Sequence, residues 1–121
     1  MATDTLERAE VEVGRDEATI GADISIIRRH LRRKLTIEWT DELDGVFYGK
    51  IMLGRKEWQC DLTYRKKYDV YRFRLYIPQD HSPQIARRFD VQAGNPYTMC
   101  NDLMAVVGTL RLIVTLDLEK D

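Results

Sequence analysis

Four short apolar-rich runs, in three of which apolar and polar residues alternate, occupy the middle of this sequence. They cover residues 35–40, 46–53, 58–64 and 70–77. An alternation with a period of two is typical of half-buried strands, because successive side chains of a strand point to opposite faces of the sheet. The connections are short, and Asp44-Gly45 between the first two runs is typical of a hairpin turn. The pattern therefore predicts an antiparallel meander of about four strands.

A helical pattern precedes the meander. Its apolar residues recur at intervals of three and four positions: Ile20, Ile24, Ile27 and Leu31. This period predicts an amphipathic helix over residues 20–34, for which Asp23 or Ser25 is a candidate N-terminal cap. The end of the segment is rich in cations: Arg28, Arg29, Arg32, Arg33 and Lys34. Cations are favoured near the C-terminus of a helix, so these side chains can simply form its solvated face.

The length of the chain suits one domain. Its 121 residues are enough for an ordinary hydrophobic core and too few for two full-sized domains. Residues 1–19 predict an acidic N-terminal arm or a short strand, since Val11 and Val13 alternate with acidic residues and glycine. Residues 20–121 are then expected to form a single α+β domain, in which the helix packs against the antiparallel sheet.

The segment after the meander has a mixed pattern. Residues 78–84 predict a loop, and residues 86–92 predict a short strand or a turn of helix. Beyond the turn-rich residues 93–97, we expect a short helix over residues 102–107 that ends near Gly108. The alternating leucines after this glycine predict a closing strand. Apolar residues on both sides of the glycine also fit a helical period, so a C-terminal helix is the alternative.

Charge is distributed unevenly along the chain. The total is −1, from 19 basic and 20 acidic residues. Residues 28–74 hold 13 basic and seven acidic residues, whereas residues 1–27 hold two basic and seven acidic ones. Either the acidic ends fold back onto the basic middle, or the middle presents a basic face to an acidic partner. The near-neutral total lacks the basic excess expected of a nucleic-acid-binding protein, so nucleic acid is the less favoured partner.

Several kinds of site and segment have no signal in the sequence. The glycines form no nucleotide-binding loop, and the two histidines and two cysteines lack the spacing of metal ligands, so we expect no cofactor and no metal. The N-terminus has no secretory signal pattern. The apolar stretch over residues 103–116 is too short and too polar to span a bilayer. We expect a cytoplasmic protein without a membrane partner, in which both cysteines are thiols.

Cys100 is the candidate nucleophile. It follows a Gly-Asn-Pro loop at residues 94–96 and precedes an Asn-Asp pair at residues 101–102 that can cap a helix. A thiol at a helix N-terminus gains thiolate character from the helix dipole and the free amide groups. The alternative is that Cys100 is a small residue of the hydrophobic core, which is a frequent role of free cysteine. Cys60 alternates with apolar residues on a predicted strand and is expected to lie in the core.

The order of these segments resembles that of the ubiquitin-conjugating enzymes, including their prokaryotic-type relatives, over about residues 20–107. The matching segments are the helix at 20–34, an early strand at 47–51, the strand at 71–78 that ends in Ile-Pro, the loop at 80–83 and the Met-Cys-Asn-Asp-Leu segment at 99–103. The family's His-Pro-Asn motif has no full counterpart, and Asn95-Pro96 is its nearest match in this chain. The resemblance implies an α+β fold of the conjugating-enzyme type.

The same resemblance implies an activity, which is thioester carriage. Cys100 would accept the C-terminal acyl group of a ubiquitin-like protein from an activating enzyme and pass it to an amine. Asn95 would stabilise the developing oxyanion, and His81 would act near the amine. The partners would then be a ubiquitin-like protein and its activating enzyme, and no cofactor would be needed.

A binding module without catalytic activity is the alternative function. Over residues 46–77 aromatic residues are interleaved with cations, a combination that can stack bases and hold phosphates. The candidate binding residues are Arg28, Arg29, Arg32, Arg33, Lys66, Lys67, Arg72 and Arg74. Arg72 and Arg74 share one side of their strand, opposite an apolar side. These cations would contact an acidic protein or a nucleic acid, unless they are only the solvated side of a half-buried sheet whose aromatic residues form the core.

Overall fold

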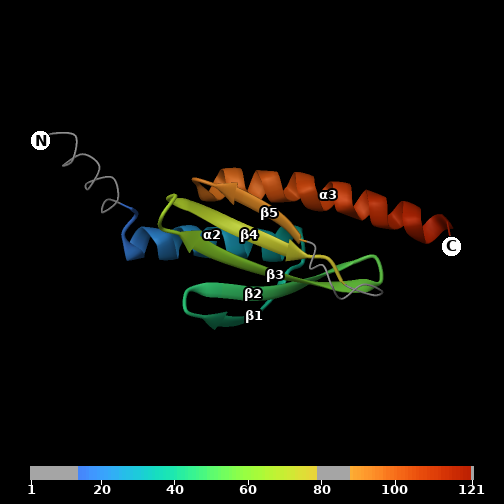
Figure 1. Cartoon of the computed structure of the whole chain (residues 1–121), viewed down its shortest axis with the longest axis horizontal. Coiled ribbons are helices and arrows are strands. Elements are labelled where there is room, and N and C mark those ends of the chain that lie inside the picture. Colours follow the sequence, from blue (N-terminus) through green and yellow to red (C-terminus); the bar gives the residue numbers. More distant parts are fainter. Residues whose placement is uncertain (1–13, 79–87, 121) are drawn as a thin grey trace, which may run out of the picture.

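The computed structural model of this chain describes residues 14–78 and 88–120, with the side chains of the last helix as far as Ile113. Its elements follow in the order α2 (Glu17–Lys34), β1 (Glu38–Leu43), β2 (Val46–Leu53), β3 (Lys56–Arg65), β4 (Val70–Tyr76), β5 (Arg88–Ala93) and α3 (Pro96–Lys120). The strands form one antiparallel sheet in the order β1-β2-β3-β4-β5 (Figure 1). The α+β class is thus confirmed, with a sheet of five strands in place of about four.

The extra strand is β5, at one edge of the sheet. It confirms the short strand predicted within residues 86–92, of which residues 86 and 87 lie outside the described part of the chain. The loop predicted at residues 78–84 also lies outside that part, except for Pro78. β5 pairs with β4 along its whole length, which places Phe89 opposite Leu75.

Both helices pack on the same face of the sheet. In Figure 1, α2 lies behind the strands and α3 runs beside β5. The core between the two layers combines Ile27 and Leu31 of α2, Leu103 and Val107 of α3, and alternate residues of the strands. Among the described residues no helix covers the opposite face of the sheet, which we call the open face.

The strand β4 shows how the alternation divides the two faces. Tyr71, Phe73 and Leu75 are buried in the core. Arg72 and Arg74, at the alternate positions, lie on the open face and are only partly buried. The prediction of one apolar and one basic side for this strand is confirmed, and these aromatic rings belong to the core.

The helix α2 begins three residues earlier than the sequence pattern predicts, at Glu17. Asp16 is its N-terminal cap, because the Asp16 carboxylate accepts a hydrogen bond from the Thr19 amide at 2.7 Å. This hydrogen bond lowers the pKa of Asp16. Residues 17–19 therefore belong to the helix and not to the predicted arm. The rest of that arm or strand, at residues 1–13, lies outside the described residues.

The prediction that Asp23 or Ser25 caps this helix was wrong, because both residues lie inside it. Asp23 has another role, since its carboxylate accepts a hydrogen bond from the Tyr71 hydroxyl at 2.6 Å. Burial, assisted by this hydrogen bond, raises the pKa of Tyr71 to about 12. The contact joins α2 to β4 at the covered face of the sheet.

The first strand is displaced from its predicted position. β1 covers Glu38–Leu43 and not residues 35–40, so residues 41–43 belong to the first strand of the hairpin. The turn needs only Asp44 and Gly45, whose φ angles of 52° and 77° suit a two-residue hairpin loop. The apolar residues before β1 are buried in the connection from α2. Their alternation therefore reflects contact with the core and not strand pairing.

The C-terminal segment is one continuous helix. The prediction of a short helix over residues 102–107 followed by a strand was wrong, because α3 runs from Pro96 to Lys120. Its buried side chains recur with a helical period: Met99, Leu103, Val107 and Leu110. Gly108 is exposed, and a glycine inside a helix costs only about 1 kcal/mol relative to alanine, so the helix continues through it. No helix among the described residues is long and apolar enough to cross a membrane.

Gly49 allows β1 and β2 to lie close together beside Trp39. A Cβ atom at this buried glycine would lie 3.0 Å from the Glu38 carbonyl oxygen and 3.1 Å from Cε3 of Trp39. We expect Gly49→Ala to lower the free energy of unfolding by about 2 kcal/mol, because the strands must shift. Gly21→Ala is the control: nothing lies within 4 Å of that Cβ position in α2, so alanine should stabilise the helix by up to about 1 kcal/mol. Urea denaturation measures both changes, and an unchanged stability of Gly49→Ala would contradict the close approach.

Candidate functional site

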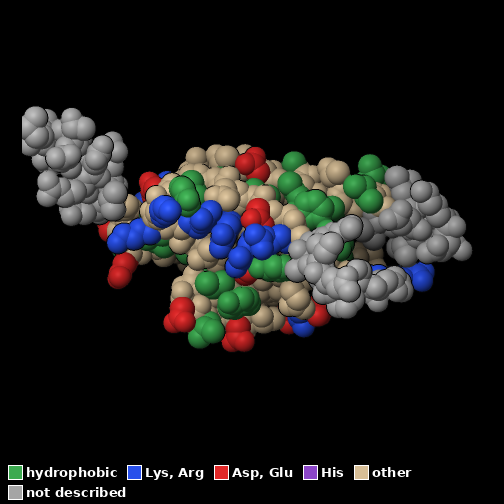
Figure 2. Space-filling model, in the orientation of Figure 1, with side chains coloured by type: hydrophobic (Ala, Val, Ile, Leu, Met, Phe, Trp, Pro, Cys, Tyr) green, Lys and Arg blue, Asp and Glu red, His purple; other side chains and the backbone are tan. Residues whose placement is uncertain are grey.

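The candidate binding residues form two sets on different sides of the sheet. One set belongs to α2, on the covered face: Arg28, Arg29, Arg32 and Arg33. The other belongs to β4 and to the turn before it: Lys66, Lys67, Arg72 and Arg74. Figure 2 looks onto the open face and shows a band of Lys and Arg side chains across the sheet. The structure therefore does not combine the two sets into one surface.

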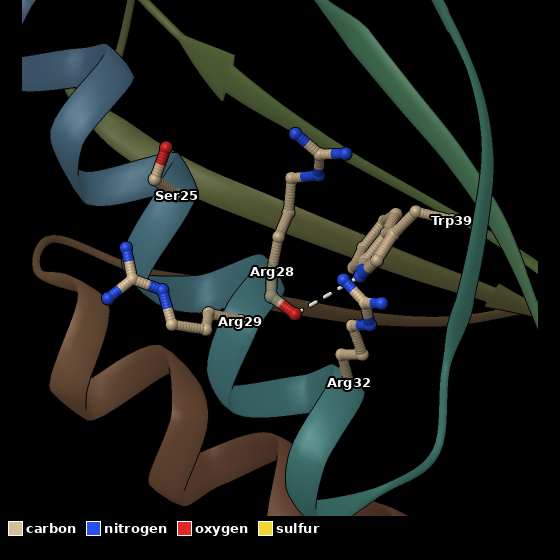
Figure 3. A pocket seen from close by; sticks show the side chains of 5 residues that line it. All are labelled: Ser25, Arg28, Arg29, Arg32 and Trp39. Atoms are coloured by element: carbon tan, nitrogen blue, oxygen red, sulfur yellow. Dashed lines mark hydrogen bonds between the residues drawn. The ribbon is translucent and has the colours of Figure 1, made fainter.

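A pocket lies where α2 meets β1. Its volume is about 240 Å³, and it is lined by Ser25, Arg28, Arg29, Arg32 and Trp39 (Figure 3). The α2 residues are three, four and seven positions apart, so they share one side of the helix. Trp39 comes from β1 and closes the pocket on the side of the sheet. We call this the α2 arginine pocket.

Arg28 is held in place by two aromatic rings. Its Cζ atom lies 4.5 Å from the ring centroid of Phe47 and 5.5 Å from that of Trp39, which are cation–π distances. The Trp39 indole Nε1 donates a hydrogen bond to the Arg28 carbonyl oxygen at 3.1 Å, and Figure 3 shows this link between strand and helix. The Nε atom of Arg28 is buried and has no hydrogen-bond partner among the described residues. The guanidinium is thus oriented by packing, with hydrogen-bonding capacity left over.

The arginines of this pocket have no carboxylate partner in the described part of the chain. The ion pairs found there involve other cations: Arg15, Lys50, Arg74 and Arg88. Arg29 and Arg32 are exposed at the rim. The three arginines that line this pocket therefore create a positive potential that favours a carboxylate or phosphate ligand, which arginine binds in a bidentate manner.

On the open face, by contrast, Arg74 is neutralised within the protein. Its Nε atom lies 2.9 Å from Oδ1 of Asp61, and the Tyr76 hydroxyl donates to Oδ2 of the same carboxylate at 2.8 Å. Asp61 is only 1% exposed, so this is a buried, hydrogen-bonded ion pair. The hydrogen bond to Asp61 raises the pKa of Arg74. Arg74 thus has a structural partner, and it is less available to a ligand than the α2 arginines.

Cys100 lies in the hydrophobic core. It is 3% exposed, and burial raises the pKa of its thiol. Cys100 is the fifth residue of α3, so the pair at residues 101–102 lies inside the helix, and the prediction that this pair caps it was wrong. Pro96 and Tyr97, predicted as part of a loop, form the first turn of the helix. The burial favours the interpretation of Cys100 as a core residue, and its nucleophilic role stays a prediction.

The structure describes only one of the other two residues of the predicted catalytic set, Asn95. Asn95 caps α3, because its side-chain Oδ1 accepts a hydrogen bond from the Thr98 amide at 2.8 Å. His81 lies outside the described residues. Cys60 is confirmed as a core residue, and burial, with the nearby Asp61 carboxylate, raises the pKa of its thiol to about 12.

Sequence reasoning missed two parts of these sites. Trp39 was assigned only to a half-buried strand, and its place opposite the α2 arginines depends on how the helix packs. Asp61 and Arg65 are four positions apart in β3 and share a face of the sheet, but the sequence pattern ended this strand at residue 64 and so did not place Arg65 on it. The pairing of β3 with β4 decides which arginine Asp61 neutralises. No local sequence pattern predicts that pairing.

A hollow of about 360 Å³ between β5 and α3 has a largely apolar lining, which includes Phe89, Val106 and Ile113. No group of three or more His, Cys, Asp or Glu side chains in the described ranges could hold a metal ion. No protein-family model, curated protein or solved structure matches this chain.

Proposed function

We propose that this protein is a non-catalytic binding module that holds an acidic segment of a partner protein in the α2 arginine pocket. The observation that carries the proposal is the set of three arginines around one pocket, without a carboxylate partner in the described residues. Uncompensated cations at this density favour the approach of an anion and increase its association rate.

The shape of the pocket supports an acidic protein segment as the ligand. Arg28 and Arg32 are about one helical turn apart, roughly 6 Å along the axis, which suits neighbouring carboxylates of an Asp- or Glu-rich stretch. A nucleic acid needs a longer basic track along its phosphates. Here the two basic sets lie on different sides of the sheet, and the total charge is −1.

The packing of Arg28 supports specific recognition rather than diffuse attraction. A guanidinium held between Trp39 and Phe47 loses less side-chain entropy on binding than a free surface arginine. Ser25 adds a hydroxyl to the pocket wall, and the Trp39 ring adds apolar area for the stem of an acidic side chain. The pocket thus offers charge, a hydrogen-bonding group and an aromatic surface.

A charge-reversal experiment tests the proposal. A fluorescent hexaglutamate peptide is titrated with the protein, and fluorescence anisotropy gives the Kd. We expect Arg32→Glu to weaken binding by about tenfold, equivalent to about 1.4 kcal/mol, because it places a carboxylate at the rim of the pocket. Arg55→Glu, with the same charge change at an exposed residue of the β2–β3 turn, should have a much smaller effect.

The alternatives give different results in the same assay. Equal losses of affinity for Arg32→Glu and Arg55→Glu would mean that only net charge attracts the peptide, and the proposal would fail. Tighter binding of a single-stranded oligonucleotide than of the peptide, with the same dependence on Arg32, would replace the acidic protein with a nucleic acid. Raising the salt concentration should weaken the peptide complex in either case.

A further inference from the structure

Two arginines on the open face lack the carboxylate partners that their neighbours have. Arg74 is paired with Asp61, and Nε of Arg88 lies 3.0 Å from Oδ1 of Asp90. Arg65 and Arg72 take part in none of the ion pairs found among the described residues. The acidic side chains of this part of the face are thus engaged by other cations, and two positive charges remain.

The pairing of three strands brings Arg65 and Arg72 together. Arg72 of β4 lies opposite Thr63 of β3 and opposite Gln92 of β5. Arg65 is two residues beyond Thr63, so it shares the open face and is a diagonal neighbour of Arg72. Its Nη1 atom lies 3.5 Å from Oε1 of Gln92, so the side chain extends across β4, where Arg72 is located. Two guanidinium groups and one amide therefore converge above β4.

The surroundings leave Arg72 short of partners. Its Nε atom is buried and has no hydrogen-bond partner in the described residues. Burial and the positive charges of Arg74 and Arg65 lower the pKa of Arg72, although Asp61 and Asp90 act in the opposite direction. Arg65 itself stacks over the Tyr68 ring at 4.4 Å. The local structure thus holds positive charges close together. A bound anion would reduce the repulsion between them.

We propose that Arg65, Arg72 and Gln92 form a second anion site, which binds the phosphate group of a phosphate monoester. The two guanidinium forks and the amide nitrogen can donate to several oxygens of a tetrahedral dianion, whereas a carboxylate offers only two oxygens in one plane. The site lies on the open face of the sheet, which no helix of the described residues covers, so the organic part of the ester has room there. It is independent of the α2 arginine pocket, because that pocket lies on the covered side of the sheet.

The test is a titration followed by the ¹H–¹⁵N spectrum of the protein. Methyl phosphate and inorganic phosphate are compared at constant ionic strength, with chloride as the reference anion. We expect saturable shifts at the amides around residues 65, 72 and 92, and binding of methyl phosphate at least as tight as that of inorganic phosphate. Arg72→Gln should weaken binding by about tenfold or more, because it removes one of the two charged forks. Arg72→Lys keeps the charge but not the planar guanidinium fork. Its affinity for phosphate should lie between those of the wild type and Arg72→Gln.

Two control variants test whether phosphate binding depends on this site rather than on other arginines of the protein. Arg55→Gln removes an exposed arginine from the β2–β3 turn and should leave phosphate binding unchanged. Arg32→Glu, which disables the α2 arginine pocket, should also leave it unchanged, so each proposal can fail without the other. The phosphate site is disproved if neither phosphate compound causes saturable shifts, or if chloride causes the same shifts as phosphate. It is also disproved if only inorganic phosphate binds, or if Arg72→Gln binds phosphate as tightly as the wild type.

Discussion

Both cysteines of the native protein should resist iodoacetamide near neutral pH and react only when the protein unfolds. Cys100 and Cys60 are 3% and 2% exposed, and burial raises the pKa of each thiol, so little thiolate is present and little of it is reachable. Alkylation then requires opening of the core. With a typical domain stability, the native rate should be lower than the rate in urea by about a thousandfold or more.

Mass spectrometry of the digested protein measures alkylation at each cysteine separately. Cys60 serves as the internal reference, because it lies on a central strand of the sheet. Protection of both residues would confirm Cys100 as a core residue and would leave the predicted thioester carriage without its nucleophile. Rapid alkylation of Cys100 beside a protected Cys60 would contradict the expected burial. That result would justify a search for an activating enzyme.

Removal of the Asp61 carboxylate should have the largest effect on stability. Asp61 is 1% exposed and accepts hydrogen bonds from Arg74 and Tyr76 at 2.9 and 2.8 Å. Asp61→Ala leaves a partly buried guanidinium without its counter-charge and the Tyr76 hydroxyl without an acceptor. Loss of one partner of a buried ion pair costs about 3 kcal/mol or more, so we expect a decrease of this size in the free energy of unfolding.

Asp90→Ala is the matched control on the same face. The side chains of Asp90 and Arg88 are 31% and 49% exposed, so their ion pair is worth less than about 1 kcal/mol. Urea denaturation of both variants should therefore show a much larger decrease for Asp61→Ala. Similar decreases for the two variants would mean that Asp61 is not a buried partner of Arg74. The double variant Asp61→Leu/Arg74→Met should recover part of the loss, because it removes both charges.

The meander could be predicted because each of its signals is local. The hairpin turn at Asp44-Gly45 has its own φ requirements, and β2 has the bounds that the sequence predicted, residues 46–53. The helical stripe of α2 was recognised for the same reason, and Ile24, Ile27 and Leu31 are buried as expected. The cap, and with it the start of the helix, was misplaced, because Asp16 and Asp23 are both acceptable caps by residue type.

The C-terminal segment shows where local patterns were insufficient. The leucines after Gly108 alternate, and together with Leu103 they also fit a helical period. The cap formed by Asn95 and the burial of Met99, Leu103 and Val107 against the sheet and α2 selected the helix. The same choice places Cys100 in the core. Neither the period nor the residue types around the cysteine could distinguish a helix start at residue 96 from one at residue 102.

The sequence by itself determined the fold class, the two faces of the sheet strands and the arginines that are candidates for binding. Only the tertiary structure decided which of those arginines have a carboxylate partner in the described part of the chain. Asp61 lies opposite Arg74 through the pairing of β3 with β4, and Arg28 lies beside Trp39 through the packing of α2 on β1. The physical reason is that helix and hairpin signals act between residues close in sequence, whereas charge compensation depends on distances in space. These distances exist only after the strands have paired and the helices have packed.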